Sequence, residues 1–299
     1  MSYTNTYYPD YEKIYPGVKI TPEVLAALRA SDRQMRRFES ELKTERFEAD
    51  NEKQVAWFIP SREDSYERLV EEDRLQFADV TGDTHGNFRR FQPEYFPKQA
   101  GMTKNDVVII AGDFGGVWFG DSRDNEALDW LESLPFTVTF VDGNHENFDA
   151  LVAYPTEEWH GGKIQRIRPH VLHLMRGQIY ELEGYRFFTL GGAMSHDTNH
   201  RINHITWWRQ ELPSDEEYSE ALQNLERCNW QVDYVITHCA PTSIARKESR
   251  HNEADRLTDF LQKIWDKTDY RYWLFGHYHD NRMIDARHIL LWEQIVQIC

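Results

Sequence analysis

The sequence is poor in cysteine and has no long apolar run. The three cysteines, Cys228, Cys239 and Cys299, are too widely spaced to predict a disulfide framework or a cysteine-ligated zinc site. No segment approaches the roughly 20 consecutive apolar residues that cross a bilayer. The first residues lack the basic and apolar regions of a signal peptide. We therefore expect a cytoplasmic protein that does not enter a membrane.

Basic residues are also scarce: 34 Lys and Arg stand against 50 Asp and Glu, which gives a formal net charge of −16. A surface of this sign repels the phosphate backbone of nucleic acids, and the sequence has no basic track that would bind it. A general nucleic-acid binder is therefore not expected. A small anionic substrate remains compatible with this charge, because bound metal cations reverse the field locally.

The composition divides the chain into three parts. Residues 1–20, rich in tyrosine and turn formers, predict a tail. Residues 21–75 predict a mostly helical extension, in which Thr21 and Pro22 begin the first helix and "KQVAWFIP" predicts a strand. The extension carries no chemical constellation, so packing against the core, binding a partner and mediating dimerisation stay open for it. The main domain, residues 76–299, follows.

Short apolar runs alternate with helix-like segments in the main domain. "DVVIIAGDFGG" contains a run of the kind that is buried on both faces of a sheet, and "DEEYSEALQNLERCN" and "EADRLTDFLQKIW" are typical of helices between strands. A hairpin is predicted from Ile179–Leu182 to Arg186–Leu190 around a Glu183-Gly184 turn. These patterns predict an α/β fold in which two mixed β-sheets pack as a sandwich flanked by helices, with the small, mostly helical extension at the N-terminus.

Polar side chains gather where five of the apolar runs end, the place where open α/β sheets bind ligands. Burying such groups without partners would be costly, and a shared metal centre would satisfy all of them. The candidate ligands are Asp83, His85, Asp113, Asn144, His238, His277 and His279. Seven side chains suit two divalent ions that share a carboxylate. Nitrogen and oxygen donors without thiolate suit Mn, Fe, Zn, Co or Ni.

The segments "GDTHG", "GDFGG", "GNHE", "THCAP" and "GHYH" resemble, in this order, the five blocks of the calcineurin-like metallophosphoesterase superfamily. The resemblance extends over residues 80–280 and does not reach residues 1–75. Other segments of the main domain resemble a bacterial branch of that superfamily. The resemblance implies that the main domain is a metal-dependent phosphoesterase, either a phosphatase or a phosphodiesterase.

The resemblance also implies a role for each ligand. The first ion is bound by Asp83, His85 and His279, the second by Asn144, His238 and His277, and Asp113 bridges the two. Mn is the preferred metal, and a hydroxide held between the two ions attacks phosphorus in line. His145 aids the transition state or protonates the leaving group. His277 and His279 would thus splay apart behind Gly276 to serve different ions, with Tyr278 packed away from the centre.

The blocks depart from the protein phosphatases of the superfamily in two places. An arginine that would bind phosphate is missing at both places. The first place lies after "GDFGG", and the second is the position before "GNHE", where Asp142 stands. These departures weaken an assignment as a protein phosphatase and leave the metal ligands intact. They also leave the partner of His145 open among Asp142, Glu146 and Asp121. We expect a small phosphomonoester or phosphodiester as the substrate.

Three further residues are candidate substrate contacts. Arg89 follows the first block and would reach a phosphate, with an exposed helix-face arginine as the equal alternative. His196 and Arg201 lie in "SHDTNHRINHITWW", which predicts either a loop over the metal ions or a surface loop whose tryptophans pack the core. For the whole chain, the alternative is a catalytically weak member of the same fold that acts as a binding or scaffold module. The presence of every ligand favours the enzyme.

Overall fold

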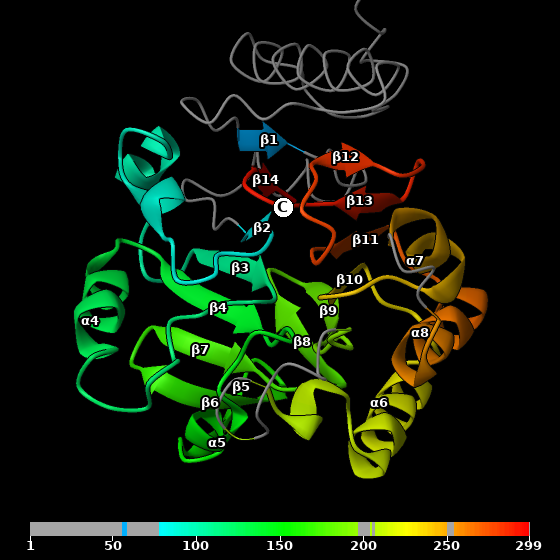
Figure 1. The fold of residues 1–299 in the computed structure, drawn as a ribbon. Helices are drawn as coiled ribbons and strands as arrows, with labels where there is room; N and C mark the ends of the chain where they lie inside the picture. Colours follow the sequence, from blue (N-terminus) through cyan, green and yellow to red (C-terminus); the bar gives the residue numbers. More distant parts are fainter. Residues whose placement is uncertain (1–55, 59–77, 197–203, 205–206, 250–253, 299) are drawn as a thin grey trace, which may run out of the picture.

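The computed structural model describes residues 56–58, 78–196, 204, 207–249 and 254–298. The predicted tail, most of the predicted extension and Arg201 lie outside these residues. The described part confirms the α/β fold, with two mixed sheets packed against each other and helices on the outer sides (Figure 1). Across the same residues, none of the helices combines the length and apolar character needed to cross a membrane.

The larger sheet has eight strands in the order β1-β14-β2-β3-β4-β7-β6-β5. These strands are β1 (Ala56–Phe58), β2 (Ala78–Thr81), β3 (Val107–Ala111), β4 (Thr137–Val141), β5 (Thr156–Trp159), β6 (Gly162–Arg168), β7 (Val171–Leu174) and β14 (Ile295–Gln297). β2, β3, β4 and β7 run parallel, so their carboxyl ends meet at one edge of the sheet. β1 lies within the predicted strand "KQVAWFIP" and pairs with β14.

The smaller sheet has six strands in the order β12-β13-β11-β10-β9-β8. These strands are β8 (Gln178–Leu182), β9 (Tyr185–Leu190), β10 (Tyr234–Thr237), β11 (Tyr272–Phe275), β12 (Arg282–Met283) and β13 (His288–Leu290). β9, β10, β11 and β13 are parallel, and β8 and β9 form the predicted antiparallel hairpin. Glu183 and Gly184 have φ values of 52° and 74°, as its two-residue turn requires.

Helices cover the outer face of each sheet (Figure 1). α4 (Asn125–Ser133) and α5 (Phe148–Leu151) lie beside the larger sheet, and α6 (Asp215–Arg227), α7 (Thr242–Glu248) and α8 (Arg256–Lys267) beside the smaller. α6 and α8 occupy segments predicted to be helical. Both begin with a capping box, Ser214 with Glu217 and Asp255 with Thr258, which satisfies the first free N–H groups of each helix.

Apolar side chains form three layers. Ile109 of β3 and Ile236 of β10 belong to the layer between the sheets. Ile110 belongs to the layer under α4, and Val235 to the layer under α8. Adjacent residues of one strand thus enter different layers, because side chains alternate between the two faces of a sheet. The central strands are buried on both faces, as the sequence predicted.

Candidate metal centre

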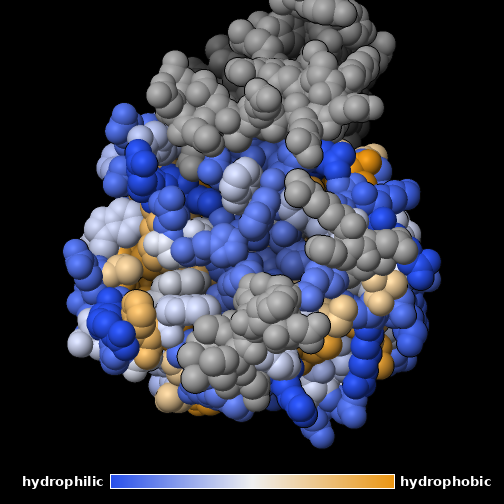
Figure 2. Space-filling model, viewed as in Figure 1, coloured by the Kyte–Doolittle hydropathy of each residue, from blue (hydrophilic) through white to orange (hydrophobic). Residues whose placement is uncertain are grey.

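Five strands deliver the predicted ligands to one region of the molecule. Asp83, Asp113 and Asn144 follow β2, β3 and β4 of the larger sheet. His238 and His277 follow β10 and β11 of the smaller sheet. The strands are parallel neighbours within each sheet, so their carboxyl ends lie together. Hydrophilic residues gather in the middle of the face shown in Figure 2.

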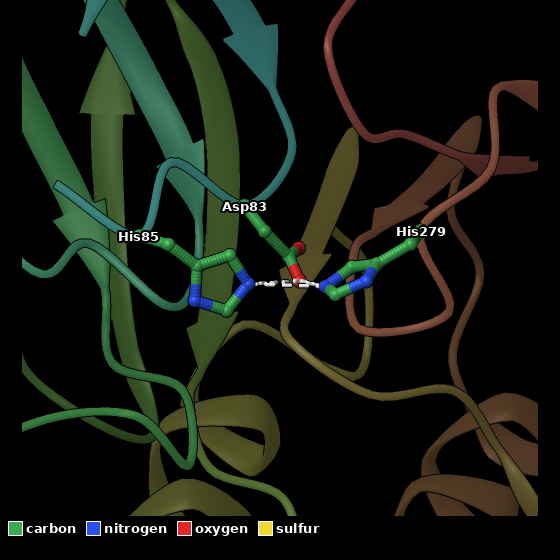
Figure 3. Close-up of side chains that lie close together, drawn as sticks. All are labelled: Asp83, His85 and His279. Atoms are coloured by element: carbon green, nitrogen blue, oxygen red, sulfur yellow. Dashed lines mark hydrogen bonds and ion pairs between the residues drawn. The ribbon is translucent and has the colours of Figure 1, made fainter. Parts of the chain in front are cut away.

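Asp83, His85 and His279 form one candidate ligand group, and their side chains point toward one another (Figure 3). Nε2 of His279 lies 3.0 Å from Oδ2 of Asp83 and 3.0 Å from Nε2 of His85. Nε2 of His85 lies 3.8 Å from the same carboxylate oxygen. Atoms bound at about 2.0–2.2 Å to one metal ion are about 3 Å apart, so this spacing suits a shared cation.

His238 is the centre of a second, buried group with Asp83 and Asp113. Its Nε2 lies 3.4 Å from Oδ1 of Asp113 and 3.3 Å from Oδ1 of Asn144. The ring of His277 stands edge-on to the ring of His238, with 4.9 Å between their centroids. The structure therefore brings together the residues that the resemblance assigns to a second ion.

The two carboxylates lie between the groups. Asp113 directs Oδ1 toward His238, whereas its Oδ2 lies 3.7 Å from Nε2 of His85. Asp83 belongs to both candidate groups. Asp113, the predicted bridging ligand, can therefore reach both ligand groups. Asp83 also lies between the two groups.

Backbone N–H groups hold both carboxylates in place. The N–H of His277 donates to Oδ1 of Asp83 at 2.9 Å, and the N–H of His145 donates to Oδ1 of Asp113 at 2.8 Å. Gly143 makes the second contact possible, because a Cβ atom at this position would overlap the Asp113 carboxylate. One oxygen of each acid is therefore fixed. In Asp113 this fixed oxygen, Oδ1, also faces His238, and Oδ2 faces His85.

Outer contacts also orient His238 and Asn144 of the second group. Nδ1 of His238 donates to the carbonyl oxygen of Ala111 at 2.9 Å, which directs Nε2 toward Asp113. The amide nitrogen of Asn144 donates to Oγ of Ser195 at 3.1 Å, which turns its oxygen toward His238. Both contacts are typical of the outer shell of a metal site.

Left-handed backbone conformations cluster at the site. Positive φ values occur at His85 (46°), Asp113 (47°), His277 (70°) and His279 (51°). Each costs a residue other than glycine about 1–3 kcal/mol, and such strain gathers at functional sites. It also lets His277 and His279 splay toward different groups, while Tyr278 packs against the buried layer of the smaller sheet, as predicted.

The buried carboxylates of the centre favour a positive charge beside them. Burial alone would raise the pKa of Asp113, but the imidazoles of His238, His145 and His85 hold it well below its usual range. Burial lowers the pKa of His238, yet Asp113 and Asp83 outweigh this effect and raise it to about 10. Oδ2 of Asp83 is buried and faces Nε2 of His279 and of His85 at 3.0 and 3.8 Å. These donors therefore fit a divalent metal ion.

His145 lies at the edge of the first group, with its ring 5.3 Å from that of His85 and nearly perpendicular to it. The three carboxylates considered as its partner have other contacts. These are Asp142 with Arg176 and His173, Glu146 with the backbone of Phe114, and Asp121 with Arg123. The partner of the His145 ring therefore stays open; its imidazole is one of the groups that lower the pKa of Asp113.

The candidate substrate contacts are less well placed by the structure. The guanidinium of Arg89 donates to the hydroxyl of Tyr95 at 3.0 Å and, within the described chain, contacts neither ligand group. His196 is exposed and directly follows Ser195, the residue that binds Asn144. Arg201 is not among the described residues. Their roles as substrate contacts remain predictions.

Sequence reasoning passed over Arg90, the neighbour of Arg89. Its buried guanidinium donates to the carbonyl oxygens of Gly82, Asp83 and Trp292 at 3.1, 2.6 and 2.5 Å. Arg90 thus supports the turn that carries the first ligand. No pattern in the sequence distinguishes which of two adjacent arginines is buried.

Comparison with known proteins agrees with this geometry. A family model described as calcineurin-like phosphoesterase matches residues 79–281, which is more than half of the chain. No curated protein matches the chain. The matched residues include all seven candidate ligands and His145.

Proposed function

The chain belongs to the calcineurin-like phosphoesterase family, and we propose on this basis that it hydrolyses a small phosphoester with two divalent metal ions. Family membership and the Asp/His groups indicate metal-dependent phosphoester hydrolysis. The observation that carries the finer proposal is the pair of ligand groups joined by Asp83 and Asp113. A single ion would bind only about half of these donors, so a second ion is needed to bind the rest.

We assign the ligands as follows: Asp83, His85 and His279 to one ion, Asn144, His238 and His277 to the other, and Asp113 to both. We propose Mn as the first candidate; the mixed nitrogen and oxygen donors suit Fe, Zn, Co and Ni as well. When bound, such ions supply a water nucleophile at neutral pH and neutralise charge on the phosphoryl oxygens.

His145 is the residue we propose to act on the departing oxygen. Its backbone is fixed by the bond to Asp113, and its ring borders the first group without belonging to it. An imidazolium in this position would stabilise the negative charge of the transition state or donate its proton to the leaving group.

A small phosphomonoester or phosphodiester is the substrate class that the surface supports best. The net charge of −16 disfavours a nucleic acid. Asp142, which stands where many protein phosphatases have an arginine, is committed to a buried pair with Arg176. This position therefore lacks the arginine that would bind the phosphate of a phosphoprotein, and the charge of Arg176 is already paired with Asp142. The free thiols of Cys228 and Cys239 suit the reducing cytoplasm, where we propose that the reaction takes place.

The test is a phosphate-release screen with Mn²⁺ over nucleotides, cyclic dinucleotides, sugar phosphates and phosphopeptides. An aryl phosphate and a bis-aryl phosphate separate monoester from diester hydrolysis. Asp113→Asn is the matched control and should lose at least about 100-fold in turnover, since a shared ligand matters at least as much as an outer-shell contact. Unchanged turnover in this variant would contradict the bridging role. Fewer than one bound ion per chain after Mn²⁺ incubation would contradict the enzyme.

A further inference from the structure

Trp292 lies against the exposed half of the proposed metal centre. Its indole is stacked on the imidazole of His279, with 5.4 Å between ring centroids and 17° between ring planes. Trp292 lies beyond residue 281, where the match to the family model ends. Its position therefore follows from this chain's own fold and from none of the matched blocks.

Trp292 belongs to the segment that crosses from one sheet to the other. β13 of the smaller sheet ends at Leu290, and β14 of the larger sheet begins at Ile295. The intervening residues pass the carboxyl ends of β2 and β11, the strands that carry Asp83 and the His277–His279 pair. A contact in this crossing can therefore couple the two sides of the centre.

Hydrogen bonds fix the backbone of Trp292 to both sides. Its N–H donates to Oδ1 of the buried Asn281 at 2.8 Å, two residues after His279. Its carbonyl oxygen accepts from the N–H of Gly82 at 3.0 Å, one residue before Asp83. The crossing segment thus joins the loop of one ligand to the turn of another.

Arg90 completes this connection. Arg90 is 6% exposed, and its guanidinium donates through Nη1 to the carbonyl oxygens of Gly82 and Trp292 and to Oγ1 of Thr81. Nη2 donates to the carbonyl oxygen of Asp83. Burial lowers the pKa of Arg90 to about 10, which still leaves it charged at neutral pH. A planar guanidinium can serve four oxygens in this arrangement, whereas an ammonium has three donors on one atom.

His279 needs such support because it is exposed and strained. Its φ is 51°, and nearly half of its side chain is open to solvent. An imidazole on an exposed loop loses rotational freedom when it binds a metal, and a neighbour that fixes the ring beforehand reduces that loss. The indole of Trp292 covers one face of the ring and leaves Nε2 directed at Asp83 and His85.

We propose that Trp292 is a positioning residue of the metal centre: anchored through its carbonyl oxygen by Arg90, it holds His279 in the orientation that binds the first ion. The proposal rests on the proposed function, since it requires that Asp83, His85 and His279 bind a divalent cation. It assigns Trp292 no contact with the substrate or with the ions.

The experiment measures Mn²⁺ binding to the full chain by isothermal titration calorimetry after chelator treatment. Trp292→Ala should lower the binding affinity for one of the two ions about 10- to 100-fold, the usual cost of removing an outer-shell partner, and leave the affinity for the other unchanged. Trp292→Phe, which keeps an aromatic ring, should recover most of the affinity. Trp230→Ala is the matched control, because Trp230 is also partly buried but lies at the end of α6.

The Mn²⁺ dependence of turnover separates a positioning role from a purely structural one. If Trp292 acts through His279, turnover of Trp292→Ala should return to the wild-type level at saturating Mn²⁺, and only the Mn²⁺ dependence should be shifted. If Trp292→Ala does not fold, Trp292→Leu replaces it as a variant of similar bulk without a ring. Wild-type affinity in the chosen variant, together with lost affinity in Asp113→Asn, would overturn this inference alone. Equal binding by Asp113→Asn and the wild type would overturn the proposed function.

Discussion

His145 and Asp113 share one hydrogen bond, but their proposed tasks can be separated at the level of single residues. The bond to Asp113 comes from the backbone N–H of His145, so it survives replacement of the side chain. His145→Gln should lower turnover about 100- to 10,000-fold, the range for loss of an acid–base group. Phosphate release and metal content by elemental analysis are the two measurements. The number of bound Mn²⁺ ions should stay the same.

The matched control for His145 is His160→Gln, since His160 is exposed at the turn between β5 and β6. Turnover of this variant should equal that of the wild type. Loss of Mn²⁺ in His145→Gln would instead show that the imidazole itself is a ligand.

Gly143 is a second residue with a predictable effect. A Cβ atom there would overlap both the carboxylate and the backbone nitrogen of Asp113, so Gly143→Ala must displace one of them. We expect Mn²⁺ affinity to fall about 10-fold or more, as for other changes that misplace a ligand. Gly101→Ala is the control, because a Cβ atom at Gly101 meets nothing within 4 Å. Equal Mn²⁺ affinity of the two variants in calorimetry would show that the turn at Gly143 adapts freely.

The candidate ligands were predictable from the sequence, but the residues that hold them in place were not. Asp83 and Asp113 each follow an apolar run and a glycine, which is a local signal. Arg90 and Trp292 act through a hydrogen bond between residues 202 positions apart. Such a contact depends on how the two sheets meet, and no pattern within a window of ten or twenty residues contains that information.

At the scale of elements, the ends of β4 and β7 are tied by a buried ion pair. Asp142 accepts from Nε of Arg176 at 2.8 Å and from Nε2 of His173 at 3.0 Å. Burial alone would raise the pKa of Asp142, but the charge of Arg176 and the bond from His173 lower it to about 2. This shift from the ordinary value of 3.8 corresponds to about 2 kcal/mol of stability.

The stability that this ion pair contributes should decrease at acidic pH. A carboxylate with a lowered pKa contributes stability above its unfolded pKa, and the contribution is lost as the pH falls from about 4 to about 2. Asp142→Asn should lose about 3–5 kcal/mol at pH 7, because it leaves the buried charge of Arg176 with only the partly exposed carboxylate of Glu217, at 3.4 Å. Urea unfolding at several pH values should show the difference from the wild type shrinking below about pH 4. Parallel curves for the two proteins would contradict this account.

Secondary structure was predictable where a pattern is long enough to be read. The hairpin β8–β9 was expected from a turn that suits positive φ, and α6 and α8 from their helical period. β12, β13 and β14 were not expected, because each has only two or three residues. Strands this short are defined by their partners: β14 exists as a strand only between β1 and β2.

At the scale of the whole molecule, the sandwich places two sets of polar strand ends against each other. β2, β3 and β4 supply Asp83, Asp113 and Asn144 from one sheet, and β10 and β11 supply histidines from the other. Two buried carboxylates at this junction favour closure of the sheets only if a positive charge accompanies them. The folded protein should therefore bind a divalent ion far more tightly than the unfolded chain does.

Metal binding should consequently raise the thermal stability of the whole protein. An ion present at about 100 times its dissociation constant adds about 3 kcal/mol to the free energy of unfolding. For a domain of this size, the melting temperature should then rise by about 5 to 10 °C per ion. Calorimetric scans with Mn²⁺ and with a chelator measure this difference. In Asp113→Asn most of the increase should vanish, because Asp113 faces both ligand groups. An equal increase in this variant and the wild type would mean that Mn²⁺ stabilises the protein from another site.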